Sequence, residues 1–126
     1  MLEKKNAIAT IPVKNINTAK RFYEGALGLK PDPSGSEPGV LSYKSGSTPV
    51  LVYQSEYAGT NKATAATWMV GEDVEGVVQE LKTKGVAFEK YDFPDTTRKG
   101  DVHIHGNNKA AWFKDPDGNI LAIVNG

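Results

Sequence analysis

The sequence predicts an α+β fold in which two βαβββ modules pair their sheets into a curved, mixed cup. The order strand, helix, strand, strand, strand can be traced twice along the chain, and Val70 follows Val13 at the same interval by which Gly85 follows Gly28. A chain of 126 residues with 39% hydrophobic and 24% charged residues is ordinary for a soluble globular protein. The repeat and the composition together favour one domain built from two similar halves.

This domain is expected to span 1–126, with module one at 6–55 and module two at 64–126. The boundary falls in the segment 56–63, which is polar and lacks a hydrophobic period. Each module would place one helix on one face of its sheet. The opposite faces of the two sheets would then surround a cavity.

Module one opens with a strand and an amphipathic helix. Side chains alternate over 7–13, as in a strand with one buried face. Apolar residues then recur at helical spacing over 16–27, with Asn15 or Asn17 as the cap and Gly28 as the stop. The rest of the module is expected to hold a short strand at most within 30–38, followed by strands at 40–43 and 49–53.

Module two repeats this order. A strand at 65–70 precedes a helix that Asp73 caps and Gly85 ends. The stretch 95–108 is polar and carries both histidines of the chain. Further strands are expected from 86 toward 93, at 110–113 and at 120–124, the last two joined by the turn at 115–119.

Charge and cysteine content exclude several classes of protein. Lysine and arginine number 15, as do aspartate and glutamate, so the basic excess typical of nucleic-acid-binding proteins is missing. The absence of cysteine excludes disulfides, thiolate catalysis and cysteine-ligated metal centres. No stretch is long and apolar enough for a membrane span or a secretory leader. We therefore expect a cytoplasmic protein that acts on neither nucleic acid nor membrane.

Three segments together resemble the vicinal oxygen chelate superfamily of glyoxalases, bleomycin resistance proteins and extradiol dioxygenases. They are IPVKNINTAKRFYEGALGL at 11–29, WMVGEDVEGVVQELKTKGV at 68–86 and AAWFKDPDGNILAI at 110–123. The resemblance covers nearly the whole chain. It implies a glyoxalase/bleomycin-resistance-like domain over 1–126, and it implies a homodimer, because family members bury their sheet edges against a second subunit.

The resemblance also implies where a metal would be bound. Activity in the family usually depends on four ligands, two from each module and mostly histidine or glutamate. The corresponding positions here are Ile8, Ala65, a residue at or next to Val52, and Ala122. None of these offers an imidazole or a carboxylate. We therefore expect neither a metal nor another cofactor, as in the bleomycin-resistance branch, which sequesters its ligand in a dimer crevice.

Without its metal, the cup would be a small-molecule pocket that is apolar apart from a few hydroxyl groups. By resemblance, Trp112 faces this cup and Phe113 faces the helix layer. The same set of side chains also suits a cup that is filled by its own residues. The expected ligand-binding residues are Ile8, Thr10, Val52, Ala65, Thr67, Met69, His103, His105, Trp112 and Ala122.

His103 and His105 are the only histidines, so any imidazole chemistry must use them. If 102–105 is extended, both rings point to the same side of the strand. Three interpretations stay open at this point. The two histidines could be solvated in a polar hairpin, could line the rim of the pocket, or could bind a metal together with Asp95, Asp101 or a second subunit.

The favoured function is that of a metal-free protein which binds a small aromatic or amphipathic ligand in the cup or in a dimer groove. This hypothesis includes no catalytic residue. The alternative is a metal-dependent lyase, isomerase or dioxygenase with a displaced site at His103 and His105, completed by Asp101 or Glu89. A third possibility is a scaffold or regulatory dimer without a ligand.

Overall fold

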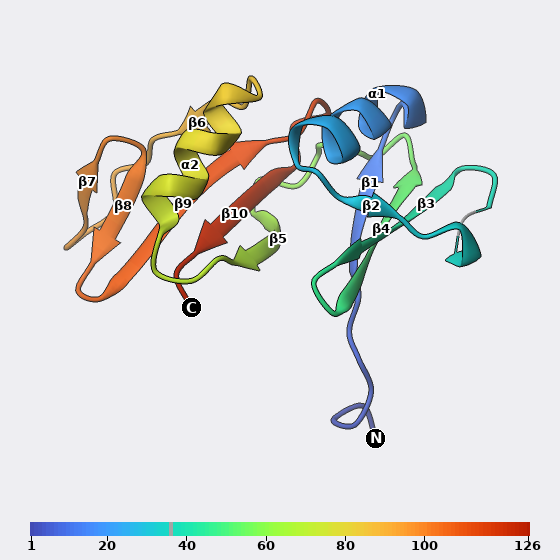
Figure 1. The fold of residues 1–126 in the computed structure, drawn as a ribbon, viewed down its shortest axis with the longest axis horizontal. Coiled ribbons are helices and arrows are strands. Elements are labelled where there is room, and N and C mark those ends of the chain that lie inside the picture. Colours follow the sequence, from blue (N-terminus) through green and yellow to red (C-terminus); the bar gives the residue numbers. More distant parts are fainter. Residues whose placement is uncertain (36) are drawn as a thin grey trace.

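The computed structural model describes residues 1–35 and 37–126, and it has two twisted sheets side by side, each with a helix on the same side (Figure 1). Ser36, in the stretch expected to hold a short strand at most, lies outside the described residues. Within the described ranges, no helix is long and apolar enough to cross a membrane.

The first sheet has the strand order β1-β4-β3-β2. Its strands β1 and β4 are parallel, and the other pairs are antiparallel. The helix after β1 starts as an α-helix, α1, and continues as a π-helix over Arg21–Ala26. The elements of this module are β1 (Ala9–Val13), α1 (Ile16–Lys20), β2 (Lys30–Pro31), a 3-10 turn (Pro33–Gly35), β3 (Val40–Ser45) and β4 (Thr48–Gln54).

The second sheet has the strand order β5-β10-β9-β8-β7, and β6 pairs with β9 outside that path. Here β5 and β10 are the parallel pair. The polar stretch with the histidines forms the hairpin of β7 and β8, an addition that module one lacks. The elements are β5 (Thr64–Met69), α2 (Val74–Thr83), β6 (Phe88–Glu89), β7 (Thr97–Lys99), β8 (Val102–His105), β9 (Asn108–Lys114) and β10 (Ile120–Val124).

The α+β class and the repeated order of elements are confirmed. The residues expected to begin and end the helices also do so. The side chain of Asn15 accepts a hydrogen bond from the Thr18 amide, and that of Asp73 accepts one from the Gly76 amide. Gly28 follows the first helix with a φ of 71°, in the left-handed region where glycine ends helices without strain.

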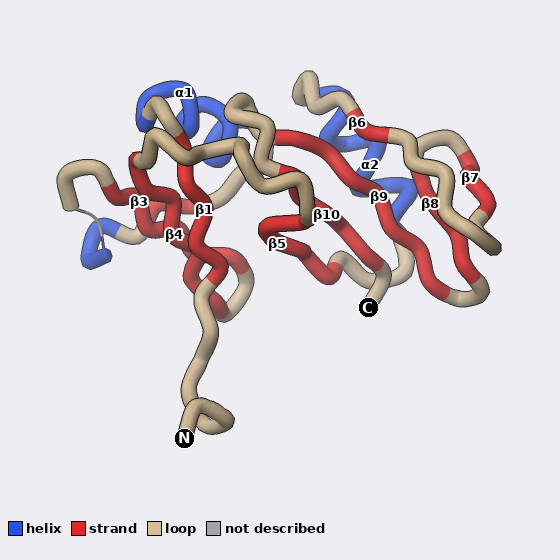
Figure 2. The backbone as a smooth tube through the Cα atoms, turned by 180° about the vertical axis from the view of Figure 1, so that it is seen from behind, coloured by secondary structure: helices blue, strands red, loops and turns tan. Residues whose placement is uncertain are grey.

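The hydrophobic core lies between the sheets and the helices and continues across both modules. Ile11 and Val52 are fully buried in module one, as is Leu121 in module two. The rings of Phe22 and Phe113 meet where the modules join, with their centroids 6.4 Å apart. We call the opposite side of the two sheets the open face. Figure 2 views the structure from that side, with the helices behind the strands.

Backbone pairing does not join the two sheets: in the described part of the chain, they share no hydrogen-bonded ladder. A buried carboxylate joins them instead. Asp115, in the turn between β9 and β10, is 4% exposed and accepts a 2.7 Å hydrogen bond from the Tyr23 hydroxyl of module one. The Asn119 side-chain amide donates both to Asp115 and to the Pro12 carbonyl, at 2.7 Å each.

The environment of Tyr23 keeps its hydroxyl group a donor. Burial raises the pKa of the Tyr23 phenol far above its ordinary value, and the neighbouring Asp115 charge raises it further. The backbone amides of Asp117 and Asn119 donate to the other Asp115 oxygen, at 3.0 and 2.9 Å. Four donors therefore satisfy a carboxylate that has little access to water.

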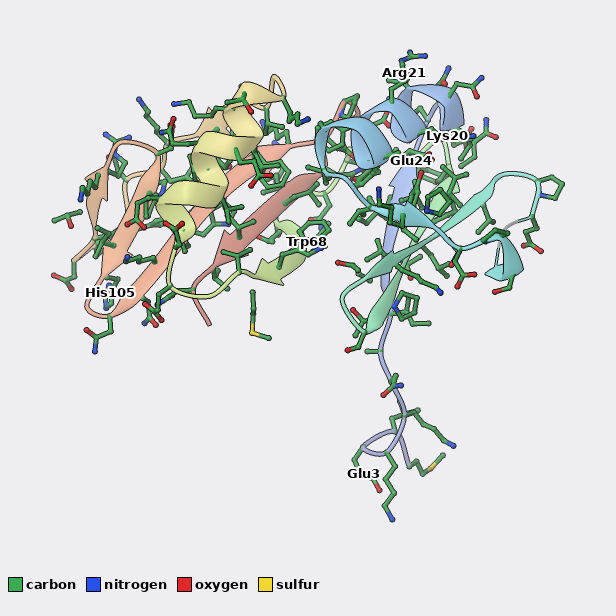
Figure 3. All side chains as sticks on the ribbon, in the orientation of Figure 1. Glu3, Lys20, Arg21, Glu24, Trp68 and His105 are labelled. Atoms are coloured by element: carbon green, nitrogen blue, oxygen red, sulfur yellow. The ribbon has the colours of Figure 1, made fainter. Side chains whose placement is uncertain are left out.

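Two further contacts hold the modules together. On the helix side, the indole nitrogen of Trp68 donates a 2.8 Å hydrogen bond to the Ser45 hydroxyl, and Trp68 lies between the modules (Figure 3). In the linker, Gly59 has a φ of 75°, and a Cβ at this position would overlap the carbonyl oxygen of Asp117. The linker therefore packs directly against the turn that carries Asp115.

Removing the Tyr23 hydroxyl tests the contribution of the buried carboxylate. In Tyr23→Phe, we expect the free energy of unfolding to fall by about 1.5–3 kcal/mol, because Asp115 loses a donor that water cannot replace. Tyr43→Phe is the matched control. Its hydroxyl donates to Glu24, which is only partly buried and can turn to water. Urea denaturation measures both variants, and equal losses would contradict the special role of Asp115.

Candidate functional site

Four rings form a cluster in module two: Tyr91, Phe93, His103 and Trp112. Each ring contacts the other three, with centroids 4.9–6.0 Å apart. Tyr91 and Phe93 come from the segment after β6, His103 from β8 and Trp112 from β9. The cluster is thus built from three segments that meet only in the folded chain.

Strand alternation explains why this cluster lies on the open face. Along β9, Ala111 and Phe113 are buried in the core, so Trp112 between them points to the other side. In the same way, Val102 of β8 belongs to the core and its neighbour His103 does not. The pairing of His103 with Ala110 then places the imidazole next to Trp112.

His103 is buried, and only one of its two ring nitrogens has a partner. Its side chain is 3% exposed, and Nε2 accepts a 2.9 Å hydrogen bond from the Tyr91 amide. A neutral imidazole that accepts at Nε2 carries its hydrogen on Nδ1. Among residues 1–35 and 37–126, nothing bonds to this Nδ1. His103 therefore fixes the backbone at Tyr91 and supports the Trp112 indole, with which it makes an edge-to-face contact.

The two histidines of β8 differ in exposure, although their spacing of two residues places both on one side of the strand. His105 is exposed and lies at the end of β8, beside the turn into β9 (Figure 3). Its ring makes no contact with the four-ring cluster as far as the described residues show. Of the three interpretations, the solvated hairpin agrees with the exposure of His105, whereas His103 is buried in the four-ring cluster, beside a cavity that it does not line.

This cavity has a volume of about 700 Å³ and lies beside the cluster. Trp112, Tyr91 and Phe93 form its aromatic wall, and Phe93 is 46% exposed. The Trp112 indole donates a 3.2 Å hydrogen bond to the Thr64 hydroxyl, which fixes the orientation of the ring. The remaining lining residues are Gly59, Asn61, Lys62, Ala63, Thr64, Lys114, Gly118 and Ile120.

A β-bulge in β5 brings Thr64 into this cavity. Thr64 pairs with Ile120, but the next residue of β10, Leu121, pairs with Ala66. Ala65 is therefore an extra residue in the ladder, and Thr64 and Thr67 both face the open side. Ala65 lines a neighbouring cavity together with Thr10, and that cavity shares Thr64 and Asn61 with the first.

The other residues expected at the site fall into two groups on the open face. Ala122 is 3% exposed and pairs with Trp112, so it lies beneath the aromatic cluster. Ile8, Thr10, Thr67 and Met69 are exposed, Met69 to 77%. The described residues of one chain thus bring His103, Trp112 and Ala122 together, and they bring Thr10 and Ala65 together at the neighbouring cavity.

The expected place of Val52 on the cup side requires a correction. Val52 pairs with Ile11 in the parallel ladder of β1 and β4, and both side chains are fully buried in the core on the helix side. The open face of β4 carries Leu51 and Tyr53 instead. Strand alternation alone could not choose between the two faces of such an apolar strand.

Tyr91 and Phe93 were missed as site residues, although a weak signal for them exists. Their spacing of two residues places both rings on one side of an extended segment. The expected strand from 86 toward 93 contained that signal, but β6 itself is limited to Phe88–Glu89. Lys62 and Asn61 were also missed, because the polar segment 56–63 offered no pattern beyond that of a linker.

A family model for the glyoxalase/bleomycin resistance protein/dioxygenase superfamily matches residues 6–123. The chain belongs to this superfamily. No curated protein matches the sequence. Several solved structures share the fold of this superfamily member over nearly their whole length.

A glyoxalase family protein from Enterococcus faecalis is 21% identical, with a TM-score of 0.73, and 99% of this chain and 100% of that one are covered. Lactoylglutathione lyase from Agrobacterium tumefaciens is 14% identical, with a TM-score of 0.72 and 100% and 96% covered. The fosfomycin resistance protein FosX from Mesorhizobium loti is 13% identical, with a TM-score of 0.68 and 100% and 94% covered. At these identities, the similarity establishes the fold.

The residues of this superfamily member do not fit the metal that the fold implies. The positions at which the resemblance places the usual ligands hold Ile8, Ala65, Ala122 and the apolar or phenolic side chains around Val52. Residues 1–35 and 37–126 contain no group of three or more histidine, cysteine, aspartate or glutamate side chains that could bind an ion. Structural and catalytic zinc sites typically use at least three such side chains.

Placing one ligand back into the site should harm the protein. Ala122→Glu puts a carboxylate beneath Trp112 without a partner, and we expect a loss of about 1–3 kcal/mol in the free energy of unfolding. Thr67→Glu is the matched control, because Thr67 pairs with Ala122 across β5 and β10 but is exposed. Thermal and urea unfolding measure both variants. A stable Ala122→Glu protein would show that this position is hydrated, against the buried site described above.

Proposed function

We propose that this superfamily member is a metal-free binding protein that holds a small aromatic or amphipathic molecule on the open face of its sheets. One observation carries this proposal: a cavity of about 700 Å³ has an aromatic wall. The positions at which the resemblance places the metal ligands hold apolar residues in both modules, which supports binding without a metal. Ligand pockets are typically concave and apolar, with a few oriented polar groups. No chemical step is assigned to the site.

The aromatic cluster is well suited to stacking against a ligand. The Trp112 indole donates to the Thr64 hydroxyl and makes an edge-to-face contact with His103, so it is oriented before any ligand binds. Phe93 exposes almost half of its surface, which a flat ligand would cover. Preorganised aromatic surfaces of this kind lose little conformational entropy on binding.

We also propose that the protein works as a homodimer in the cytoplasm. The two sheets leave an open side, and apolar side chains such as Ile8 and Met69 are exposed there, to 43% and 77%. A second copy could cover these side chains and the free edges of the sheets. The cysteine-free composition is compatible with a reducing compartment.

The rival function is that of an enzyme with a displaced site at His103 and His105. The fold supports this rival, since lactoylglutathione lyase from Agrobacterium tumefaciens shares it. The positions of the imidazoles weigh against it. His103 uses Nε2 to accept the Tyr91 amide hydrogen, and His105 lies at the exposed end of β8. A shared site that uses this nitrogen would need His103 to give up its hydrogen bond with the Tyr91 amide.

Contact quenching of tryptophan fluorescence tests where the ligand binds. A suitable probe is 1,3-dinitrobenzene, a flat, neutral molecule that quenches the fluorescence of an indole on contact. In Trp68→Phe, which keeps only Trp112, we expect quenching that saturates as the site fills. In Trp112→Phe, we expect weak quenching without saturation, because Trp68 is on the helix side near Val77 and Leu81. Saturable quenching of Trp68 alone would place the ligand on the wrong side of the sheet for this proposal.

A further inference from the structure

Two polar side chains that line the aromatic cavity, Asn61 and Thr64, keep a hydrogen-bond donor free. Asn61 uses its side-chain oxygen to accept the Ala63 amide hydrogen at 3.2 Å, which leaves its NH₂ group available. Thr64 uses its hydroxyl oxygen to accept the Trp112 indole hydrogen at 3.2 Å, which leaves its O–H hydrogen available. Both side chains therefore offer hydrogens to the cavity.

The charged residues at the cavity also favour a ligand that accepts hydrogen bonds. Lys62 and Lys114 line it, and no carboxylate does so among the described lining residues. Lys114 forms a 3.0 Å ion pair with Glu89, which offsets part of its charge. Lys62 has no ion-pair partner within residues 1–35 and 37–126. A positive charge at Lys62 therefore remains available to an incoming group.

The aromatic side of the cavity has the shape of a wall. The rings of Tyr91, Phe93 and Trp112 already contact one another at 5.5–5.7 Å, so they leave no space for a cation between them. An aromatic cage for a quaternary ammonium group would need such a space, and the two lysines would repel the ligand's charge. A flat, uncharged ring can stack against the wall, because it needs no space between the rings and is not repelled by the lysines.

From these observations we infer that the cavity takes a planar aromatic acid, with its ring against Trp112 and Phe93 and its anionic group at Lys62. The anion could be a carboxylate, a sulfonate or a phosphate, because each presents only acceptor atoms to the donors of the rim. This inference rests on the proposed function and specifies the chemical class of its ligand. Recognition needs no metal ion and no bond is made or broken.

Three probes with the same naphthalene ring test the inference by isothermal titration calorimetry. They are 2-naphthoate, the neutral 2-naphthamide and the cationic 2-naphthylmethylammonium. We expect 2-naphthoate to bind about tenfold more tightly than the amide, as one charge-assisted hydrogen bond would give. The cation should bind most weakly. Added salt should weaken the binding of 2-naphthoate more than that of the amide.

Substitution of the lysines identifies the groups that bind the anion. Lys62→Gln should remove most of the preference for 2-naphthoate over 2-naphthamide and leave the affinity for the amide unchanged. Lys114→Gln should have a smaller effect in the same direction, because Glu89 already shares that charge. Lys20→Gln is the matched control: it makes the same change in net charge on α1, on the helix side of the molecule (Figure 3). Thermal unfolding confirms that each variant is folded.

The outcomes separate this inference from the proposed function. Equal affinity for 2-naphthoate and 2-naphthamide in the wild type would overturn the anionic ligand while supporting an aromatic binding site. Tighter binding of the ammonium probe would likewise overturn the anionic ligand while supporting an aromatic binding site. If Lys20→Gln lost as much of the preference for 2-naphthoate as Lys62→Gln, the preference would come from the overall charge of the protein. That result would contradict a contact at Lys62. Failure of all three probes to bind would overturn both the inference and the aromatic ligand of the proposed function.

Discussion

The Asp115 carboxylate is the interaction on which the arrangement of the two modules depends. The sheets share no backbone ladder within the described residues, so side-chain contacts must fix their relative position. Asp115 receives hydrogens from Tyr23, from the Asn119 side chain and from two backbone amides, and Asn119 also binds the Pro12 carbonyl. A buried carboxylate that loses such donors carries a large desolvation cost, which makes the joined arrangement favourable.

The same turn also positions the cavity. Lys114 and Ile120 stand at the two ends of this turn, and both line the cavity. The linker residue Gly59 packs against Asp117, and its amide donates to the Asn119 side chain at 3.4 Å. Asn61 and Lys62 follow directly in the chain. The interaction that joins the modules therefore also positions donor groups that line the same cavity as Tyr91, Phe93 and Trp112.

Local patterns in the sequence predicted most of the elements, because helix caps, stops and alternation act over a few residues. The caps Asn15 and Asp73 follow from such patterns, whereas the face of Phe113 follows from the family resemblance. Features that depend on pairing between distant strands were beyond these patterns. Examples are the parallel register that buries Val52, the bulge at Ala65, and the burial of His103 while His105 stays exposed. Tyr91 and Phe93 join the site only because β8 and β9 bring His103 and Trp112 to them.

The central proposal is that this superfamily member binds its ligand without a metal ion. Calorimetric titration of the purified protein with Zn²⁺, Ni²⁺ and Mn²⁺, in separate experiments, tests this claim most directly. The side chains of Ile8, Ala65 and Ala122 provide no ligating atoms, and the His103 imidazole is buried. We therefore predict no saturable heat of binding for any of the three ions. Tight binding of one ion per chain, abolished by His103→Ala, would contradict the account and favour an enzyme with a displaced metal site.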